Sequence, residues 1–343
     1  MGGNRQDIAQ AVEADGPAPE GTMRAVVQDT YGSADVLRLA WRARPEIGEH
    51  EVLVHVHAAG LDRGTWHLMA GQPYLMRLGF GLRRPRNPVP GRDVAGTVAE
   101  VGSAVTGFAV GDEVFGVAPG SFAEYAVAPE GKLARKPAGL FFEQAAVVPI
   151  SAMTALQGLT DIGKVQAGQK VLVIGASGGV GTYAVQLAKA FGAEVTGVAS
   201  TAKLDLVRSV GADHVLDYTR DDFADGSQRY DLILDIGGNP ALSRLRRALT
   251  PRGTAVIVGG EGGGNWTGVG RQLRAVVLSM FVRQRLAIFV SKERASDLAR
   301  LVGLIEAGKV TPSIDRTYPL DQAPAAMLRL VAGEVRGKVA ISI

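Results

Sequence analysis

A glycine-rich run, residues 171–181, constrains the fold of this chain more than any other feature of its sequence. Four aliphatic residues at its start are typical of a buried strand, and the glycines lead directly into a helix-like stretch. Read as A-x-G-x-x-G, the run places Ala176 at the tight turn, Gly178 where the backbone must approach a pyrophosphate, and Gly181 where helix meets strand. A purely structural turn is the alternative, but the strand–turn–helix context favours dinucleotide binding. The candidate cofactor-binding residues of this turn are Ala176, Ser177, Gly178, Gly179, Val180 and Gly181.

The acidic residue that usually follows such a turn by about 20 residues, where it holds a ribose hydroxyl, is missing from the expected place. The second strand carries Glu194 at its amino end, whereas ligands bind at the carboxyl ends of parallel strands. At the carboxyl end stand Ser200, Thr201 and Lys203. Two hydroxyls and a cation suit a 2′-phosphate, although an ordinary helix N-cap beside a solvated lysine is the alternative. The sequence therefore predicts NADP(H), not NAD(H), as the cofactor.

The composition excludes several classes of site and partner. None of the 343 residues is a cysteine, so disulfides, thiolate nucleophiles and cysteine-ligated metals are ruled out. The formal net charge is only +3, which is a weak basis for binding nucleic acid. No stretch approaches the roughly 18 uninterrupted apolar residues of a membrane span. We therefore expect neither a nucleic acid nor a membrane as a partner.

The first 22 residues are predicted to form a separate, disordered tail. They are acidic and polar, include Pro17 and Pro19, and lack the basic start and apolar stretch of a secretory signal. We therefore expect the folded part to reside in a reducing cytoplasm.

The pattern of predicted elements changes near residue 148. Residues 23–148 read as short strands with glycine turns, which is typical of a barrel-like or rolled-sheet domain. Residues 149–290 alternate strand and helix, the signature of a doubly wound parallel sheet. Residues 291–343 are predicted to return to the first domain. The predicted fold class is α/β, with a Rossmann-type doubly wound parallel sheet and a second, β-rich domain.

Together these residues resemble the medium-chain dehydrogenase/reductase superfamily, and specifically its zinc-free quinone oxidoreductase branch, which includes bacterial quinone reductases and reticulon-interacting oxidoreductases. The resemblance implies that residues 23–148, completed by 291–343, form a GroES-like catalytic domain, and that residues 149–290 form the NADP-binding domain. Besides the glycine-rich run, the matching stretches are Ala58-Ala59-Gly60-Leu61-Asp62, Pro90-Gly91-Arg92-Asp93-Val94-Ala95-Gly96-Thr97-Val98, Gly111-Asp112-Glu113-Val114, Gly211-Ala212-Asp213-His214-Val215-Leu216-Asp217-Tyr218 and Arg336-Gly337-Lys338-Val339.

The zinc site of the alcohol dehydrogenases in this superfamily is altered here. Those enzymes carry a cysteine at the position of Asp62, and Gly-His-Glu where this chain has Gly-Arg92-Asp93. An arginine cannot ligate a cation. His55 and His57 share a strand face, but no third ligand is evident, and we favour a solvated strand face. We expect no metal, which disfavours simple alcohol oxidation.

A nicotinamide enzyme without a metal can still transfer hydride to a quinone or an activated α,β-unsaturated carbonyl, because such acceptors are already electrophilic. The resemblance implies that a loop facing the nicotinamide supplies the candidate catalytic residues Asp62, Trp66 and Tyr74. Tyr74 is either a proton donor or an aromatic wall of the pocket. Asp62 stands where relatives have asparagine, and pairing with Arg63 or Arg92 is its alternative role. Trp66 is expected to line the pocket by its shape.

The resemblance also implies further cofactor contacts. Thr154 would lie beside the nicotinamide and Tyr218 near the adenosine. The backbone around Phe289 and Val290 would lie near the carboxamide, and Lys338 would approach from the returning chain. The predicted activity is zinc-independent, NADPH-dependent reduction of a quinone or enone; an enoyl-thioester reductase and a non-catalytic NADPH-binding protein are the alternatives.

Two basic clusters remain. Five arginines in a Gly/Pro-rich stretch, residues 77–92, form either a mobile lid that attracts anionic ligands or, as we favour, a solvated loop. Four more lie among apolar residues at 271–285, before a strand-like stretch, residues 286–290. This second pattern predicts an edge strand covered by a second copy, in a homodimer.

Overall fold

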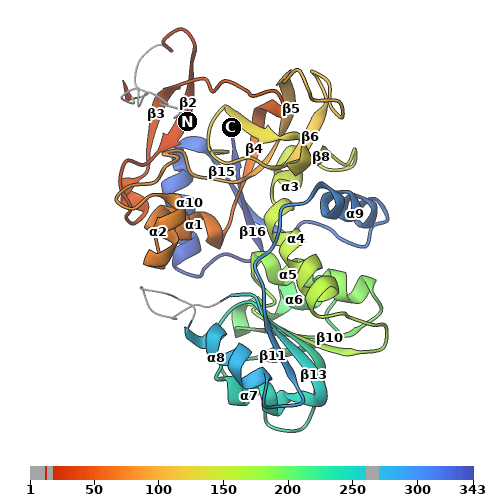
Figure 1. Cartoon of the computed structure of the whole chain (residues 1–343). Coiled ribbons are helices and arrows are strands. Elements are labelled where there is room, and N and C mark those ends of the chain that lie inside the picture. Colours follow the sequence, from red (N-terminus) through yellow and green to blue (C-terminus); the bar gives the residue numbers. More distant parts are fainter. Residues whose placement is uncertain (1–11, 14–17, 260–269) are drawn as a thin grey trace.

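The computed structural model describes residues 12–13, 18–259 and 270–343 (Figure 1). Within them, one parallel sheet has the strand order β11-β10-β9-β12-β13-β14. Counted from β9, this is the order 3-2-1-4-5-6 of a dinucleotide-binding Rossmann domain, which confirms the predicted doubly wound sheet. Its strands are β9 (Lys170–Ile174), β10 (Glu194–Ala199), β11 (His214–Asp217), β12 (Tyr230–Asp235), β13 (Leu249–Ile257) and β14 (Arg285–Ile288).

Helices cover both faces of this sheet, so the strands are apolar on both sides. Val171 and Val173 of β9 lie in one buried cluster, together with side chains of the helices that precede and follow the strand. Leu172 and Ile174, which alternate with them, lie in another cluster on the opposite face. The helices of this half are α4 (Pro149–Gln157), α5 (Gly179–Ala190), α6 (Leu204–Ser209), α7 (Leu242–Ala248) and α8 (Gly270–Ser279), with the short turns η4 (Gly158–Ile162) and η5 (Thr201–Lys203).

The other half is built on a mostly antiparallel sheet in the order β15-β16-β4-β5-β6-β8, with β7 paired to β4. Its last strand in sequence, β16, comes from the end of the chain and pairs antiparallel with β4. Figure 1 shows β16 between the two halves of the molecule. The strands are β2 (Thr22–Val27), β3 (Arg38–Ala43), β4 (Glu51–Leu61), β5 (Asp93–Val101), β6 (Glu113–Val117), β7 (Tyr125–Pro129), β8 (Leu133–Arg135), β15 (Ile314–Pro319) and β16 (Lys338–Ser342), of which β2 and β3 form a separate small sheet.

Short helices connect these strands. Two of them, α1 and α2, follow β4 and lie near α10, on the side of the molecule that carries the predicted catalytic loop (Figure 1). The helices are α1 (Arg63–Ala70), α2 (Arg77–Phe80), α3 (Phe142–Ala146), α9 (Ala295–Glu306) and α10 (Ala323–Val331), with turns η1 (Ala34–Val36), η2 (Tyr74–Met76), η3 (Glu130–Lys132) and η6 (Leu320–Gln322). No helix in the described part of the chain is long and apolar enough to cross a membrane.

The tail that we predicted to be disordered, residues 1–22, contains residues that form strands. Two of its residues form the short strand β1 (Val12–Glu13), which pairs antiparallel with β3, and Thr22 already begins β2. Strand pairing supplies these residues with main-chain hydrogen bonds that composition alone does not reveal. Residues 1–11 and 14–17 lie outside the described residues.

Candidate functional site

The glycine-rich turn joins β9 to α5 and is less crowded at Gly178 than at Gly181. A methyl group built on Gly178 would meet the Gly175 carbonyl oxygen only at 3.4 Å, so a ligand can approach the backbone there. One built on Gly181 would lie 2.1 Å from that same oxygen, because helix and strand pack closely at this point. The tight turn falls one residue earlier than predicted: Gly175, not Ala176, is left-handed, with φ of +84°. Gly178 is also the N-cap of α5, whose unpaired first-turn amides favour an anionic ligand.

The residues predicted to hold the adenosine end lie together at the carboxyl ends of β10 and β11. Ser200 and Thr201 directly follow β10. Tyr218 directly follows β11, and its amide donates to the Ala199 carbonyl at the end of β10 (3.1 Å). The Tyr218 side chain is 64% exposed, so its ring is available to a ligand at this edge.

A carboxylate does reach this edge, contrary to our expectation. Asp217 ends β11 opposite Ala199 of β10, is buried, and accepts a hydrogen bond from the Thr201 hydroxyl. Its other oxygen accepts from the Thr219 amide (3.0 Å) and hydroxyl (2.7 Å). The bonds from Thr201 and Thr219 hold the pKa of Asp217 below its usual value. Inspection of the second strand alone missed this residue, because the neighbouring strand supplies it.

Lys203 is engaged with the returning chain. Its Nζ donates to the carbonyl oxygens of Gly333 (2.6 Å) and Val335 (2.7 Å). Partial burial lowers the pKa of Lys203, and the charges of Arg336 and Arg329 lower it further. Lys203 therefore anchors the segment that leads into β16, which sequence reasoning did not predict. Arg336 is exposed, and its charge acts on Lys203. Sequence reasoning did not select Arg336, although it stands beside Gly337 and Lys338 in a stretch that matches the superfamily.

Segments far apart in sequence meet where the nicotinamide end is expected. Thr154 Oγ1 donates to the Ile150 carbonyl (2.7 Å) and lies 3.0 Å from Ser291 Oγ, directly after Val290. Phe289 lies beside Gly158, since a methyl group built there would be 3.5 Å from its ring. The predicted contacts Thr154, Phe289 and Val290 are thus brought together; Val290 is 89% exposed.

Lys338 is buried beside the glycine-rich turn. Its Nζ donates to Ser151 Oγ (2.9 Å) and lies 3.5 Å from Asp93 Oδ2, while its stem would touch a methyl group built on Gly179. Burial raises the pKa of Asp93 to about 7; Lys338 opposes this rise, and Asp62 adds to it. The side chain of Lys338 therefore supports the turn from inside and pairs with Asp93.

Asp62 is the N-cap of α1. One of its carboxylate oxygens accepts from the Thr65 amide (2.7 Å) and hydroxyl (3.1 Å). The pairing with Arg92 that we considered is wrong, because Arg92 pairs with Glu293 instead. The other carboxylate oxygen, Oδ2, is buried and has no hydrogen-bond partner among the described residues. An Asp before a helix and a Thr three residues later are the sequence signal that indicates this cap.

The positions that match zinc ligands in the alcohol dehydrogenases do not fit a metal here. Asp62 caps a helix, Arg92 is a cation in an ion pair, and Asp93 pairs with Lys338. Among the described residues there is no group of three or more His, Cys, Asp or Glu side chains that could hold a metal ion. His57 instead lies against Thr97 (3.0 Å) and the ring of Phe142.

Of the other two candidate catalytic residues, Trp66 lies within α1 and Tyr74 lies just after the end of that helix. Trp66 is partly buried against the core of the β-rich half, and the Arg63 guanidinium lies over its ring at 5.4 Å. Tyr74 begins η2 and is 36% exposed, with the Arg77 guanidinium 4.6 Å from its ring centre. Packing against the core thus explains why a large apolar side chain stands at Trp66, whereas the ring of Tyr74 remains accessible. Their catalytic roles stay predictions.

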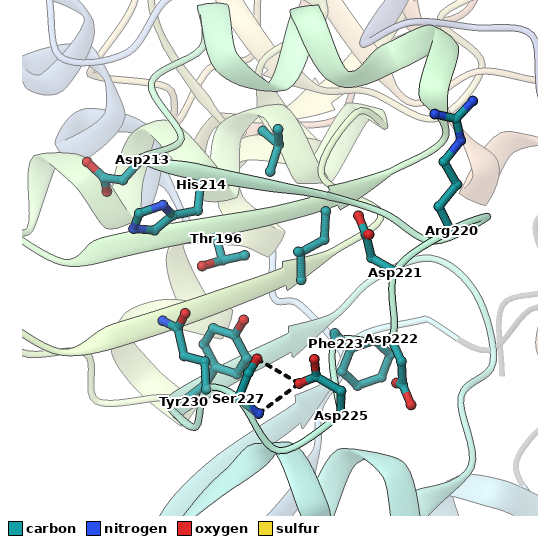
Figure 2. A pocket seen from close by; sticks show the side chains of 13 residues that line it. Thr196, Asp213, His214, Arg220, Asp221, Asp222, Phe223, Asp225, Ser227 and Tyr230 are labelled. Atoms are coloured by element: carbon teal, nitrogen blue, oxygen red, sulfur yellow. Dashed lines mark hydrogen bonds between the residues drawn. The ribbon is translucent and has the colours of Figure 1, made fainter.

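The cavity in Figure 2, of about 610 Å³, lies away from the glycine-rich turn. Acidic residues that line it already have partners: Asp213 pairs with Lys189 and Asp222 with Arg244. Asp225 accepts a hydrogen bond from Ser227, which Figure 2 shows as a dashed line. The cavity is therefore not the candidate active site. It is lined by Thr196, Asp213, His214, Val215, Leu216, Arg220, Asp221, Asp222, Phe223, Asp225, Ser227, Gln228 and Tyr230.

A Rossmann domain with an open glycine-rich turn, joined to a β-rich domain by the returning chain, defines a two-domain oxidoreductase. Two family models match: residues 48–138 match an alcohol dehydrogenase GroES-like domain, and residues 210–341 match a zinc-binding dehydrogenase. The chain belongs to the medium-chain dehydrogenase/reductase superfamily, as its motifs suggested.

Relatives of known name span nearly the whole chain. A 2-methylene-furan-3-one reductase of Solanum lycopersicum is 36% identical over 93% of this chain and 79% of its own length. The mitochondrial NAD(P)H oxidoreductase RTN4IP1 of Mus musculus is 33% identical over 94% of this chain and 89% of its own length. A chloroplastic NADPH-dependent alkenal/one oxidoreductase of Arabidopsis thaliana is 35% identical over 96% of this chain and 82% of its own length.

Solved structures agree with this fold. The quinone oxidoreductase from Coxiella burnetii superposes with a TM-score of 0.83 at 29% identity, covering 94% of this chain and 99% of that one. The mycobacterial protein Rv1454c, solved with NADPH, superposes with a TM-score of 0.80 at 27% identity, covering 94% and 100%. The predicted cofactor, NADP(H), agrees with the names of these relatives.

Proposed function

We propose that this chain is a zinc-independent, NADPH-dependent reductase of activated α,β-unsaturated carbonyls and quinones. The observation that carries the proposal is the altered metal site beside an open glycine-rich turn. Asp62, Arg92 and Asp93 are a helix cap and two ion-paired residues, so no Lewis acid would activate an alcohol there. An acceptor that is already conjugated does not need one.

The residues present fit a dinucleotide. Gly178 leaves room for the pyrophosphate, and the N-terminus of α5 favours its negative charge. Arg336 and Lys203, whose charges act on one another, would supply positive charge near the adenosine ribose, where a 2′-phosphate would sit. When bound, NADPH would supply the hydride, and the protein would supply orientation and exclusion of water.

The names of the relatives support the acceptor class. Two of them are named for an enone or alkenal substrate and others for quinones. In this chain Tyr74 is the candidate proton donor or pocket wall, and the unpaired Oδ2 of Asp62 is a second polar atom in the same segment.

Steady-state oxidation of NADPH by chelator-treated protein, with a panel of quinones, enones and enoyl thioesters, tests the proposal. We expect turnover with at least one acceptor, unchanged by the chelator. Turnover confined to enoyl thioesters and abolished in Tyr74→Phe would favour the enoyl-thioester reductase. Tight NADPH binding without any turnover would favour the non-catalytic NADPH-binding protein.

We also propose a homodimer formed at the β14 edge. β14 is an end strand of the sheet, and apolar side chains of β14, of the adjoining α8 and of the residues that directly follow each are exposed. These side chains are Leu273, Val276, Val277, Met280, Phe281, Ile288 and Val290. Sedimentation of the wild type against Val277→Glu/Phe281→Glu tests this; an unchanged sedimentation coefficient in the variant contradicts it.

A cytoplasmic location stays a prediction, since relatives are named for mitochondria and chloroplasts.

A further inference from the structure

The segment after Tyr74, residues 75–86, presents apolar and cationic side chains to solvent together; we call it the basic apolar loop. Its exposed apolar residues are Leu75, Leu78, Phe80 and Leu82, of which Leu78 and Leu82 are 65% and 67% exposed. Its exposed cations are Arg83, Arg84 and Arg86. No acidic residue lies between Asp62 and Asp93 in the sequence. Packing against the residues that the structure describes does not account for such a surface, and patches of this kind mark interaction sites.

The loop is held in this conformation by its base. Arg77 donates from Nε to the Gly71 carbonyl (2.9 Å), and its guanidinium lies over the rings of Tyr31 (4.4 Å) and Tyr74 (4.6 Å). The Tyr31 hydroxyl donates to the Gly81 carbonyl (2.6 Å). Within the loop, the Arg86 amide donates to the Phe80 carbonyl (2.8 Å). Arg77 is therefore used to hold the base of the loop. The other three arginines and the apolar side chains are exposed at the surface.

We propose that the basic apolar loop docks this chain on the surface of an anionic phospholipid bilayer. Arginines on such a surface attract the negative headgroups, and leucine and phenylalanine side chains insert at the boundary between headgroups and acyl chains. Reversible membrane binding needs both contributions, and the loop supplies both within 12 residues. The proposal departs from our expectation that no membrane is a partner, which rested on the absence of an apolar span.

A loop that exposes several apolar side chains together favours a bilayer over an acidic protein. A protein partner would need a pocket for each apolar side chain, whereas a fluid interface accepts them without a complementary shape. The proposal does not depend on the reductase activity, and its test uses no NADPH. If both hold, docking would place the enzyme where apolar quinones dissolve.

Co-sedimentation of the full chain with vesicles tests the proposal. Vesicles of phosphatidylcholine with phosphatidylglycerol are compared with vesicles of phosphatidylcholine alone, at low and high salt. We expect binding to the anionic vesicles only, weakened by salt. The variant Arg83→Gln/Arg84→Gln/Arg86→Gln should lower the partition coefficient by about tenfold or more. Leu78→Ser/Phe80→Ser should also lower it, although it removes no charge.

The matched control removes three charges elsewhere. Lys170, Arg252 and Lys309 are exposed and lie outside the loop, so Lys170→Gln/Arg252→Gln/Lys309→Gln should keep its partition coefficient within about twofold of the wild type. Thermal unfolding confirms that each variant is folded. A wild type that binds no vesicles overturns the proposal, as does a control triple that loses as much binding as the loop triple. Binding to polyglutamate without binding to vesicles overturns it in favour of an acidic protein.

Discussion

The ammonium of Lys338 lies 3.5 Å from the carboxylate of Asp93, in an ion pair whose two side chains are 1% and 0% exposed. Lys338 begins the last strand of the chain and Asp93 begins β5, so the pair joins the C-terminus to the β-rich half beside the glycine-rich turn. Because the same lysine donates to Ser151 at the start of α4, it also contacts the Rossmann half. The returning chain is therefore coupled to the candidate active site through one buried cation.

Removal of this cation should destabilise the fold. Lys338→Met leaves Asp93 buried without its partner, which we expect to lower the free energy of unfolding by roughly 3–5 kcal/mol at alkaline pH, where the Asp93 carboxyl is ionised. In Lys338→Met/Asp93→Asn, where no buried charge is left, part of that loss should be recovered. Urea unfolding measures both. A double variant no more stable than Lys338→Met would show that the charge of Asp93 is not the cause.

The stability should also depend on the protonation of Asp93. Its pKa in the folded chain is about 7, against 3.8 for an ordinary aspartate. The native state therefore binds more protons than the unfolded state between these values, and this residue's contribution to the free energy of unfolding falls as pH rises through that range. Unfolding of the wild type and of Asp93→Asn at several pH values isolates this contribution, which the variant lacks. A difference between the two that does not change with pH contradicts the assignment.

Gly178 and Gly181 form a matched pair of substitutions on the same turn. Gly178→Ala places a methyl group in ordinary contact with the Gly175 carbonyl oxygen and puts alanine at the N-cap of α5. The free energy of unfolding should therefore fall by no more than about 1 kcal/mol, whereas NADPH affinity should fall about tenfold or more. Gly181→Ala forces a methyl group against backbone and should cost roughly 1–3 kcal/mol of stability. Calorimetric titration with NADPH and thermal unfolding separate the effects. Equal NADPH affinity of Gly178→Ala and the wild type would exclude the pyrophosphate from this position.

The preference for a phosphorylated cofactor should reside in Arg336. Its side chain is exposed, so Arg336→Gln should fold normally. Loss of a charge-assisted bond to the 2′-phosphate should weaken NADPH binding about tenfold and leave NADH binding unchanged. Titration with both cofactors measures this, with Arg252→Gln as the charge-matched control. Equal losses for the two cofactors would mean that Arg336 acts elsewhere.

Much of the fold could be predicted from the sequence, because alternating and continuous apolar runs report burial directly. The doubly wound parallel sheet and the strand-rich character of the other half were both predicted from such runs. The site residues were harder, since their partners come from distant segments. Arg92 meets Glu293, and Thr201 meets Asp217 of the neighbouring strand. Neither pairing leaves a periodic signal, because both depend on how strands pair and how the chain returns.

Transfer of deuterium to an enone from NADPH that carries deuterium at both C4 positions, by chelator-treated protein, tests the proposed function most directly. If the chain binds NADPH at the glycine-rich turn and passes hydride to a conjugated acceptor without a metal, mass spectrometry should find one deuterium on the reduced carbon. An unlabelled product, no product, or a product that forms only when zinc is restored would contradict it.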